Sequence, residues 1–386
     1  MSHFQFQTVN NIISGLGSIQ ELATILSVHS YNKVLLVTDA GMLQHELHLP
    51  IVKILESINL DYIIYSEVQA DPTESIVLDA VQFAKNNAVD VVIGFGGGSS
   101  MDVAKVIAIL ADSQQTQTIQ ELYGVNNAKS PRLPLILIPT TAGTGSEVTP
   151  ISIVTTGKTT KTGIVAPILY ADVAILDATF TQGLPAQITA ATGIDAMVHA
   201  IEAYTSKIKK NFYADMLAKQ ALKLLNKNLK LVLQDGSNLE ARQNMLLGSM
   251  LAGQAFANSP VGAVHALAYP LGGHFHLSHG HTNALVLVEV MKFNAPNAKP
   301  LYAELMQHLD PYSKGSTDGL CDLFIDHMQT HLDHSGLTLK LKNLDVAENM
   351  LPVLASDAML QTRLLQNNPR ELQHQDALSI YQAIYQ

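Results

Sequence analysis

The sequence predicts an α/β domain followed by an all-α domain, and three observations support this. Strand-like apolar runs alternate with helical segments as far as Asp177, which is typical of a parallel sheet with helices packed on it. After Asp177 the strand signal disappears and the pattern is helical. The chain has 386 residues, more than the roughly 250 to 300 at which a single core stops growing. We therefore expect two domains, residues 1–180 and 181–386.

The predicted strands of the first domain are short runs rich in Val, Ile and Leu. Three helices are predicted between them: Ala40–Leu55, a helix that Thr73 caps and that runs to Ala84, and Ser99–Leu110. The fourth run is apolar enough for burial on both of its faces. The predicted strands are Lys33–Thr38, Tyr62–Val68, Val91–Phe95 and Leu133–Ile138, and then the shorter Ile151–Thr155, Thr162–Val165 and Val173–Leu176.

The second domain is predicted to consist of helices. Tyr213–Leu233 reads as a long amphipathic helix, and Leu239–Ala257 as another with small residues on one side. A helix from Val261 should end near Pro270, because proline has no N–H to continue the helix. Gly272 and Gly273 then let the chain turn before the next helix begins near His279.

Composition limits the partners of the chain. The formal charge is −10 and no extended basic face is present, so nucleic acid is excluded as a partner. Charged residues make up 15% of the chain against roughly 25% in typical soluble proteins, which favours a homo-oligomer, with a dimer as the expected form. No stretch has the length of a membrane span and the start lacks a signal-peptide pattern, so we expect a cytoplasmic protein.

A glycine-rich turn follows the third predicted strand. Three consecutive glycines, Gly96, Gly97 and Gly98, precede Ser99 at the start of a predicted helix. Such a turn lets the backbone approach a ligand, and the N-terminus of the helix attracts an anion, for which a pyrophosphate is the best fit. A tight strand-to-helix connection explains the glycines equally well, since the common G-x-G-x-x-G pattern of dinucleotide sites is not matched.

Two other strand ends carry polar residues suited to a nucleotide. The fourth strand is followed by a turn with hydroxyl groups at Thr140, Thr141 and Thr144, at the edge where open α/β sheets bind ligands. Asp39 ends the first strand, where its carboxylate could accept hydrogen bonds from a ribose diol and repel a 2′-phosphate. A helix N-cap is an equally good explanation for Asp39.

Asp195 and His199 form a candidate metal-binding pair in the second domain. They are four residues apart in a helix that is predicted to start at Thr192 and Gly193, so both side chains lie on one face. Such a pair alone is more often a surface hydrogen bond than a metal site. However, five of the fifteen histidines lie between His265 and His281, and His265 and His279 can converge on the same face. One carboxylate and three imidazoles suit iron or zinc.

These motifs together resemble the iron-containing (group III) alcohol dehydrogenases, a family whose architecture is that of dehydroquinate synthase and glycerol dehydrogenase. The resemblance covers essentially the whole chain. The carrying segments are GFGGGSSMDVAK from Gly94, PTTAGTGSEVTP from Pro139, ATGIDAMVHAIEAYTS from Ala191 and AVHALAYPLGGHFHLSHGHTNAL from Ala263. It implies a Rossmann-like NAD-binding domain and a helical metal-binding domain.

The resemblance also implies roles for individual residues. It implies that NAD and a divalent metal, iron before zinc, serve hydride transfer between NAD and a primary alcohol or small diol and its aldehyde, through a metal-bound alkoxide. Asp39 matches an acid that favours NAD over NADP, and Phe256 matches a position in the substrate pocket. The implied metal ligands are Asp195, His199, His265 and His279, and the implied cofactor contacts are Gly96, Gly97, Gly98, Ser99, Thr140, Thr141, Thr144 and Lys161.

The chain departs from the family pattern at Tyr269. Family members often have a histidine there that is suggested to carry a proton, and a phenol with a pKa near 10 does not simply replace it at pH 7. Tyr269 is therefore either a packing residue or a catalytic one. If it only packs, water and ribose hydroxyls or one of His274 and His276 would move the proton.

Other functions fit the sequence less well. A lyase like dehydroquinate synthase would need basic residues for its anionic substrate, yet residues 183–206 contain no Lys or Arg and residues 231–281 contain only Arg242. Oxidation of a secondary alcohol, as by glycerol dehydrogenase, stays an alternative. A metal-independent maleylacetate reductase is disfavoured by the complete ligand set, and a non-catalytic metal-binding protein does not explain the two turns.

Overall fold

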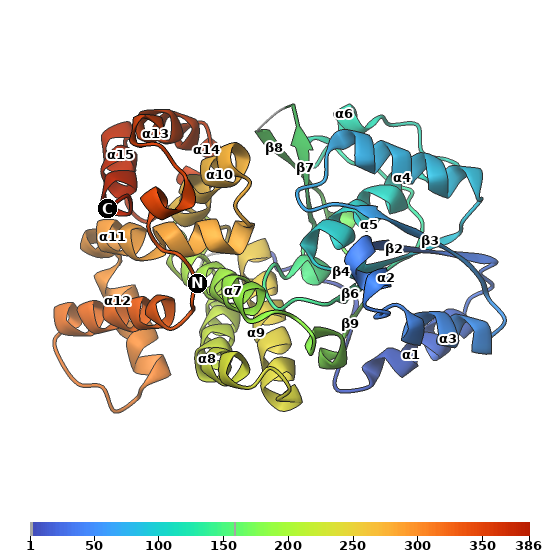
Figure 1. Ribbon diagram of the computed structural model, residues 1–386, viewed down its shortest axis with the longest axis horizontal. Helices are drawn as coiled ribbons and strands as arrows, with labels where there is room; N and C mark the ends of the chain where they lie inside the picture. The colour runs from blue at the N-terminus through green and yellow to red at the C-terminus, as the bar shows by residue number, and fades with distance from the viewer. Residues whose placement is uncertain (1–2, 158–159) are drawn as a thin grey trace. The chain divides into compact units, whose positions relative to one another are not determined.

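The computed structural model describes residues 3–157 and 160–386 and divides into two compact units (Figure 1). One unit spans Gln7–Gly183 and is called the α/β unit here. The other consists of Leu184–Gln386 with the residues up to Phe6, and is called the helical unit. The change from strands to helices along the sequence therefore coincides with a change of compact unit.

A six-stranded parallel sheet forms the centre of the α/β unit. The four inner strands are almost entirely buried and are rich in Val, Leu and Ile, as strands covered on both faces require, whereas the two edge strands are partly exposed. All four of the longer predicted strands are present, and the sheet also contains β1, which the sequence did not predict because its four residues carry little pattern. The strands stand in the order β1 (Asn11–Ser14), β9 (Val173–Leu176), β6 (Leu135–Pro139), β4 (Val91–Gly96), β2 (Lys33–Asp39) and β3 (Asp61–Val68).

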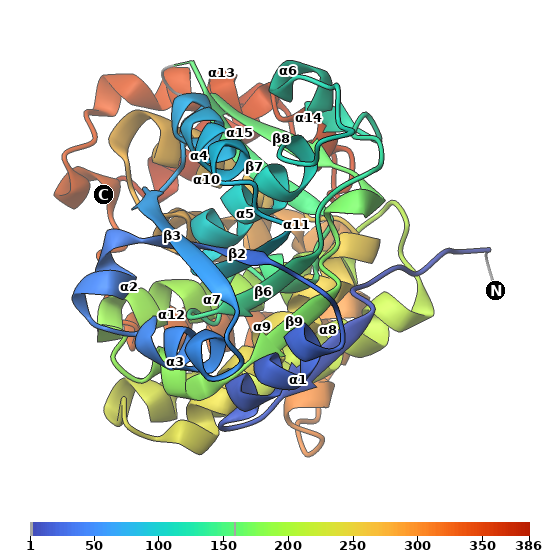
Figure 2. The ribbon, with the colours of Figure 1, turned by 90° about the vertical axis from the view of Figure 1, so that its right-hand side faces the viewer.

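Helices cover both faces of this sheet (Figures 1 and 2). On one face lie α4 (Glu74–Asn86) and α5 (Gly98–Leu110); on the other lie α1 (Glu21–Ser27), α2 (Ala40–Gln44) and α3 (Leu49–Ser57). The predicted helix Ala40–Leu55 is wrong as one element: the chain breaks between α2 and α3, where Glu46 takes a left-handed backbone conformation with φ 56°.

A small second sheet lies in the same unit. It contains β5 (Gly124–Val125), β8 (Thr160–Val165) and β7 (Ile151–Thr156), next to a short helix α6 (Ile119–Leu122). The two longer strands pair antiparallel and correspond to the short predicted strands, whereas the third predicted short strand, β9, joins the main sheet instead.

The helical unit contains the remaining long helices. Its central helix α7 is buried along most of its length and packs on α8, α9 and α11. Asparagine side chains cap α8 and α9 by accepting backbone N–H groups of the first turn. The helices are α7 (Ala186–Thr205), α8 (Phe212–Gln234), α9 (Leu239–Asn258), α10 (Ala263–Phe275), α11 (His279–Leu309), α12 (Thr317–Asp333), α13 (Leu351–Met359), α14 (Thr362–Leu365) and α15 (His374–Ala383).

Two helices of this unit continue through prolines. The predicted end of a helix near Pro270 is wrong, because α10 continues through Pro270 to Phe275, and α11 contains Pro296 and Pro300. A proline removes one backbone hydrogen bond of the helix. The apolar side chains of α10 are buried on nearly every side, so tertiary packing outweighs that loss.

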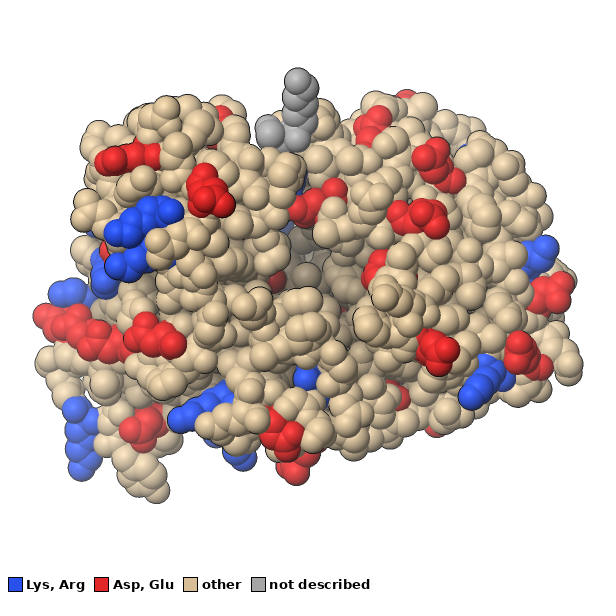
Figure 3. Space-filling model, viewed as in Figure 1, with Lys and Arg blue, Asp and Glu red and all other residues tan. Residues whose placement is uncertain are grey.

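The surface carries few charges. On the face drawn in Figure 3, Lys, Arg, Asp and Glu are scattered over a largely uncharged surface, as the charged fraction of 15% requires. Among the described residues, no helix has both the length and the apolar character needed to span a membrane.

Candidate functional site

Helix α7 places three polar side chains in the interior of the helical unit. Asp195, His199 and Glu202 have exposed fractions of 1%, 4% and 6%, and their spacing puts them on one face of the helix. The helix begins at Ala186, so the expected start at Thr192 and Gly193 is wrong. Gly193 instead allows close helix packing, since a Cβ there would lie 2.7 Å from Leu229 Cδ1.

Two further histidines reach Asp195 and His199 from other helices. His265 is the third residue of α10 and His279 is the first residue of α11. The Nε2 atoms of His265 and His199 are 3.0 Å apart. Asp195 Oδ1 lies 3.9 Å from each of these two nitrogens and 3.7 Å from His279 Nε2. One ligand atom from each of the four residues lies within 4.8 Å of all the others, so the structure brings the predicted ligands together.

This cluster fits a divalent metal ion. Bonds of about 2.1 Å in a tetrahedral site put neighbouring ligand atoms roughly 3.4 Å apart, and the distances here bracket that value. The buried carboxylates of Asp195 and Glu202 carry a formal charge of −2, which a divalent cation would neutralise. Burial opposes ionisation of Asp195, but the three histidines and Asn283 outweigh it and hold the pKa of Asp195 below its usual value.

Asn283 contacts the cluster from α11. Its Nδ2 donates to Asp195 Oδ1 at 2.6 Å and lies 3.3 Å from His279 Nε2 and 3.4 Å from His265 Nε2. Its Oδ1 is buried without a hydrogen-bond partner. Turning the amide round would set that oxygen against the Asp195 carboxylate, so the amide must present its donor to the cluster. The cluster is therefore a set of acceptors that converge on one point.

Two aromatic rings border the histidines. Phe256, on α9, stacks on the ring of His199 with a centroid distance of 4.3 Å and an interplanar angle of 20°. Tyr269, on α10, lies 5.8 Å from His279 between ring centroids. Both residues are thus beside the cluster. The two alternative proton carriers are elsewhere: His274 Nε2 is 2.7 Å from Asp357 Oδ2, and His276 is exposed at the C-terminus of α10.

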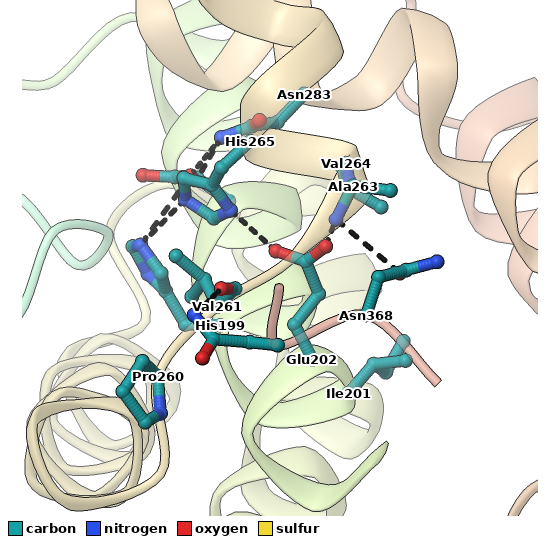
Figure 4. Close-up of polar contacts among 12 residues, drawn as sticks. His199, Ile201, Glu202, Pro260, Val261, Ala263, Val264, His265, Asn283 and Asn368 are labelled. Carbon is teal, nitrogen blue, oxygen red and sulfur yellow. Dashed lines mark hydrogen bonds and ion pairs between the residues drawn. The ribbon is translucent and has the colours of Figure 1, made fainter. Parts of the chain in front are cut away.

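Glu202 and Asn283 were not among the residues singled out from the sequence. Glu202 Oε2 lies 2.6 Å from His265 Nδ1 (Figure 4). The signal that could have found them is the same helical spacing that identified the first pair, because Glu202 follows His199 by three residues and Asn283 follows His279 by four.

In the α/β unit, the glycine-rich turn joins β4 to α5. Gly96 has φ 145°, which favours glycine. Gly97 occupies the N-cap position of α5, so the N-cap residue has no side chain to accept the first N–H groups of the helix. Gly98 packs closely against the threonine-rich turn that follows β6. A side chain would not fit there, because a Cβ would lie 2.8 Å from Thr144 Cγ2. Ser99 is in the first turn of the helix. This end of α5 can bind an anion.

The threonine-rich turn lies against the glycines. Thr140 N donates to Gly96 O at 2.9 Å, and Thr140 Oγ1 is buried without a hydrogen-bond partner. Thr141 Oγ1 would be 3.7 Å from a Cβ at Gly97. The structure therefore brings the two predicted turns together at the carboxyl ends of β4 and β6, where open parallel sheets bind ligands.

Asp39 and Lys161 have partners of their own within the α/β unit. Asp39 Oδ1 accepts the N–H of Met42 at 3.2 Å and caps α2, so the capping explanation holds. Its Oδ2 would be 3.5 Å from a Cβ at Gly96, which places the second oxygen beside the glycine-rich turn. Lys161 Nζ pairs with Asp71 Oδ1 at 2.6 Å.

A buried cluster of charged residues contacts the threonine-rich turn through Ser146. Lys105, which is fully buried, donates to Ser146 Oγ at 2.7 Å and Ile151 O at 2.6 Å, and its Nζ lies 3.6 Å from Asp102 Oδ1. Burial lowers the pKa of Lys105 and raises that of Asp102. Burial also raises the pKa of Glu147 to about 7. The sequence alone does not indicate these roles, since a lysine inside a helix usually lies on its solvent face.

Comparisons with known proteins agree with this arrangement. Residues 10–178 match the family model described as iron-containing alcohol dehydrogenase, and residues 189–385 match the C-terminal model of the Fe-containing alcohol dehydrogenase family. The chain is 36% identical over 377 residues to long-chain-alcohol dehydrogenase 1 of Geobacillus thermodenitrificans, covering 96% of this chain and 94% of that protein.

Two solved structures are similar over the whole chain. A crystal structure of 1,3-propanediol oxidoreductase has a TM-score of 0.95 and 31% sequence identity, covering 100% of both chains. The sulfoacetaldehyde reductase of Bifidobacterium kashiwanohense, solved in complex with NAD⁺, has a TM-score of 0.88 and 26% identity, covering 100% of this chain and 99% of that one.

Proposed function

The chain belongs to the iron-containing alcohol dehydrogenase family, and from this premise we propose which of its residues bind the metal and NAD. It is an NAD-dependent oxidoreductase that interconverts an alcohol and its aldehyde and uses a divalent metal, iron in this family. The observation that carries the proposal is the convergence of Asp195, His199, His265 and His279 in the interior of the helical unit.

We assign the metal to these four side chains, which offer one oxygen and three nitrogens. When bound there, the metal supplies a Lewis acid that polarises the oxygen of the alcohol or aldehyde. Asn283 holds Asp195 in place through its 2.6 Å hydrogen bond. Phe256 covers one face of His199 and keeps water from that ring, so it is placed to contact the carbon chain of a substrate. Tyr269 lies beside His279, where its hydroxyl group is our candidate for holding a proton.

NAD is assigned to the α/β unit, which supplies the two turns that meet at the sheet edge. The uncapped N–H groups at the start of α5 suit the pyrophosphate, and the buried Oγ1 of Thr140 is a further hydrogen-bonding group at the same edge. Asp39 keeps one carboxylate oxygen beside Gly96, which supports recognition of a ribose diol and exclusion of a 2′-phosphate. The support for Lys161 as a contact of NAD is weaker, because its ammonium group already pairs with Asp71.

The charges near the cluster favour a neutral substrate. Residues 183–206 and 231–281, which carry all four proposed ligands, contain one basic side chain other than histidine, Arg242. Its guanidinium group donates hydrogen bonds to the carbonyl oxygens of Gly236 and Leu184. A sulfonate or phosphate would thus meet the buried carboxylates without a cation from these segments. We propose a neutral primary alcohol or short diol as the substrate.

One experiment tests the metal and the substrate together. The purified protein is stripped of metal, reloaded with Fe²⁺ or Zn²⁺, and assayed by the absorbance of NADH. Ethanol, butanol and 1,3-propanediol are oxidised with NAD⁺, and butanal and sulfoacetaldehyde are compared as substrates for reduction with NADH. We expect activity to vanish on stripping, to return on reloading, and to favour the neutral compounds. Full activity in the stripped protein would contradict the metal assignment, and a preference for sulfoacetaldehyde would contradict the substrate assignment.

We further propose a homodimer. The support is the low charged fraction of 15% together with exposed apolar side chains such as Phe212 and Tyr312. Light scattering coupled to size-exclusion chromatography should give twice the chain mass of 41.7 kDa, and a monomer would contradict the proposal.

A further inference from the structure

Glu202 is a buried carboxylate that contacts a predicted metal ligand without belonging to the predicted ligand set. Its exposed fraction is 6%, and each of its oxygens has a different partner (Figure 4). Oε1 accepts the backbone N–H of Val264 at 2.7 Å, and Oε2 lies 2.6 Å from Nδ1 of His265. One carboxylate therefore contacts two consecutive residues of α10.

The contact with Val264 fixes how Glu202 is oriented. Val264 is the second residue of α10, so its N–H has no acceptor within the helix, and Gly262 at the N-cap position has no side chain to offer. Oε1 of Glu202 accepts this N–H. A negative group at a helix N-terminus is also stabilised by the helix dipole. With Oε1 held in this way, the second oxygen must face His265.

The contact with His265 then determines which ring nitrogen carries the proton. A carboxylate oxygen can only accept, so the proton of a neutral His265 ring lies on Nδ1. The lone pair is left on Nε2, which faces Nε2 of His199 at 3.0 Å. Asn283 agrees with this assignment, because its Nδ2 group presents a donor to Nε2 of His265 at 3.4 Å.

We propose that Glu202 is a positioning residue that holds His265 in the Nδ1–H form and so sets how tightly the four-ligand cluster binds its metal. This inference rests on the metal site proposed above. Carboxylate partners of this kind orient a ligating histidine and raise its basicity, and losing one typically costs about 10- to 100-fold in metal affinity.

Glu202→Gln separates this role from simple packing. Glutamine has nearly the same shape, and its amide oxygen can still accept the N–H of Val264. The amide nitrogen must then face Nδ1 of His265 and donate to it. That reverses the tautomer, places the proton on Nε2 and blocks the nitrogen that faces the cluster, although the start of α10 keeps its hydrogen bond.

Two measurements follow from this reversal. In metal-free protein labelled with ¹⁵N-histidine, the ¹⁵N shifts of His265, assigned by their loss in His265→Gln, should show Nδ1–H in the wild type and Nε2–H in Glu202→Gln. In competition with a chromophoric chelator, Zn²⁺ affinity should fall about 10- to 100-fold in the variant. The melting temperature of the metal-free variant shows whether it folds.

Asn368→Ala is the matched control. Asn368 Oδ1 accepts the N–H of Ala263 at 3.3 Å, so it holds the adjacent residue of the same helix start. Its amide also bonds to Asn294 and to Arg370 O, away from His265. We expect its Zn²⁺ affinity to stay within about threefold of the wild type, well inside the loss expected for Glu202→Gln. An equal loss in both variants would show that Glu202 acts only by holding the helix, and would overturn the proposal.

The remaining outcomes also decide the question. Wild-type His265 protonated on Nε2, or an unchanged Zn²⁺ affinity in a folded Glu202→Gln, would overturn the role of Glu202 while leaving the metal site standing. A wild type that binds no Zn²⁺ would instead overturn the metal site and, with it, this role. If Glu202→Gln does not fold, Glu202→Asp replaces it: its shorter side chain cannot keep both contacts, so Zn²⁺ affinity should again fall.

Discussion

The two units each bury a cluster of charged and polar side chains, and the clusters differ in how their charge is balanced. In the α/β unit, Lys105 provides a cation beside Asp102, and its ammonium group also bonds to Ser146. In the helical unit, Asp195 and Glu202 face imidazoles and an amide, and Arg242 bonds elsewhere. A cluster with its own cation serves as an internal support, whereas a cluster of converging acceptors requires a cation from outside.

The largest effect is expected where the acceptor cluster loses a ligand. Asp195→Ala removes the only oxygen ligand and should weaken metal binding by at least about 100-fold, more than the loss of a supporting contact costs. Activity should fall at least as much, because the remaining imidazoles offer no anionic ligand. Metal content of the purified variant and its rate of NADH formation measure this. A variant that retains metal and activity would contradict the claim that the cluster of the helical unit needs a metal cation.

Removing Lys105 should lower the stability of the protein and leave its metal content unchanged. Lys105→Met leaves Asp102 without its cation, and breaking a buried pair costs about 3 to 5 kcal/mol of stability. The metal content should be unchanged, since Lys105 is not part of the ligand set. Denaturant unfolding and metal analysis of the same sample test both statements. A loss of metal from a folded Lys105→Met protein would show that the clusters are not independent.

The buried Glu147 of the α/β unit should make the stability of the protein depend on pH. Burial raises its pKa from 4.5 to about 7, so the folded state holds a proton that the unfolded state releases between these values. Its contribution to stability is therefore complete below about pH 4.5 and is lost as the pH rises through 7, by about 3 kcal/mol at most. Glu147→Gln lacks this titration. Denaturant unfolding at pH 5, 6, 7 and 8 should show the two proteins diverging, and parallel curves would contradict the assignment.

The smallest effect concerns an acid that belongs to neither cluster. Asp39→Ser keeps the cap of α2, because serine and aspartate cap helices about equally well, so the melting temperature should hardly change. The charge is removed, and a repulsion of the order of 1 to 4 kcal/mol against a 2′-phosphate disappears with it. We expect kcat/KM with NADP to rise about tenfold or more relative to NAD. No gain with NADP would leave Asp39 as a cap alone.

Much of the fold was predictable because long, regular elements leave a periodic pattern. The four longer strands and the change to helices after Asp177 were predicted correctly. The strand β1 was missed because only two of its four residues are apolar. The helix that passes through Pro270 was misjudged because local rules ignore how deeply an apolar helix is buried.

The site could be predicted only as far as chain order and spacing allow. Spacing identified Asp195 and His199, the run of histidines between His265 and His281 added His265 and His279, and the structure brings these four side chains together. Hydrogen bonds between distant segments, such as those of Glu202 with α10, depend on tertiary packing that no spacing rule contains. The cap formed by Asp39 was predicted as one of two alternatives, and the structure shows that one oxygen caps the helix while the other lies beside Gly96.

The central claim is that Asp195, His199, His265 and His279 together bind one divalent metal ion, whereas the buried residues around Lys105 bind none. Calorimetric titration of the metal-stripped protein with Zn²⁺ tests it most directly. We predict one ion per chain in the wild type and in Lys105→Met, and no tight binding in Asp195→Ala. Absence of binding in the wild type, or one tightly bound ion in Asp195→Ala, would contradict the claim.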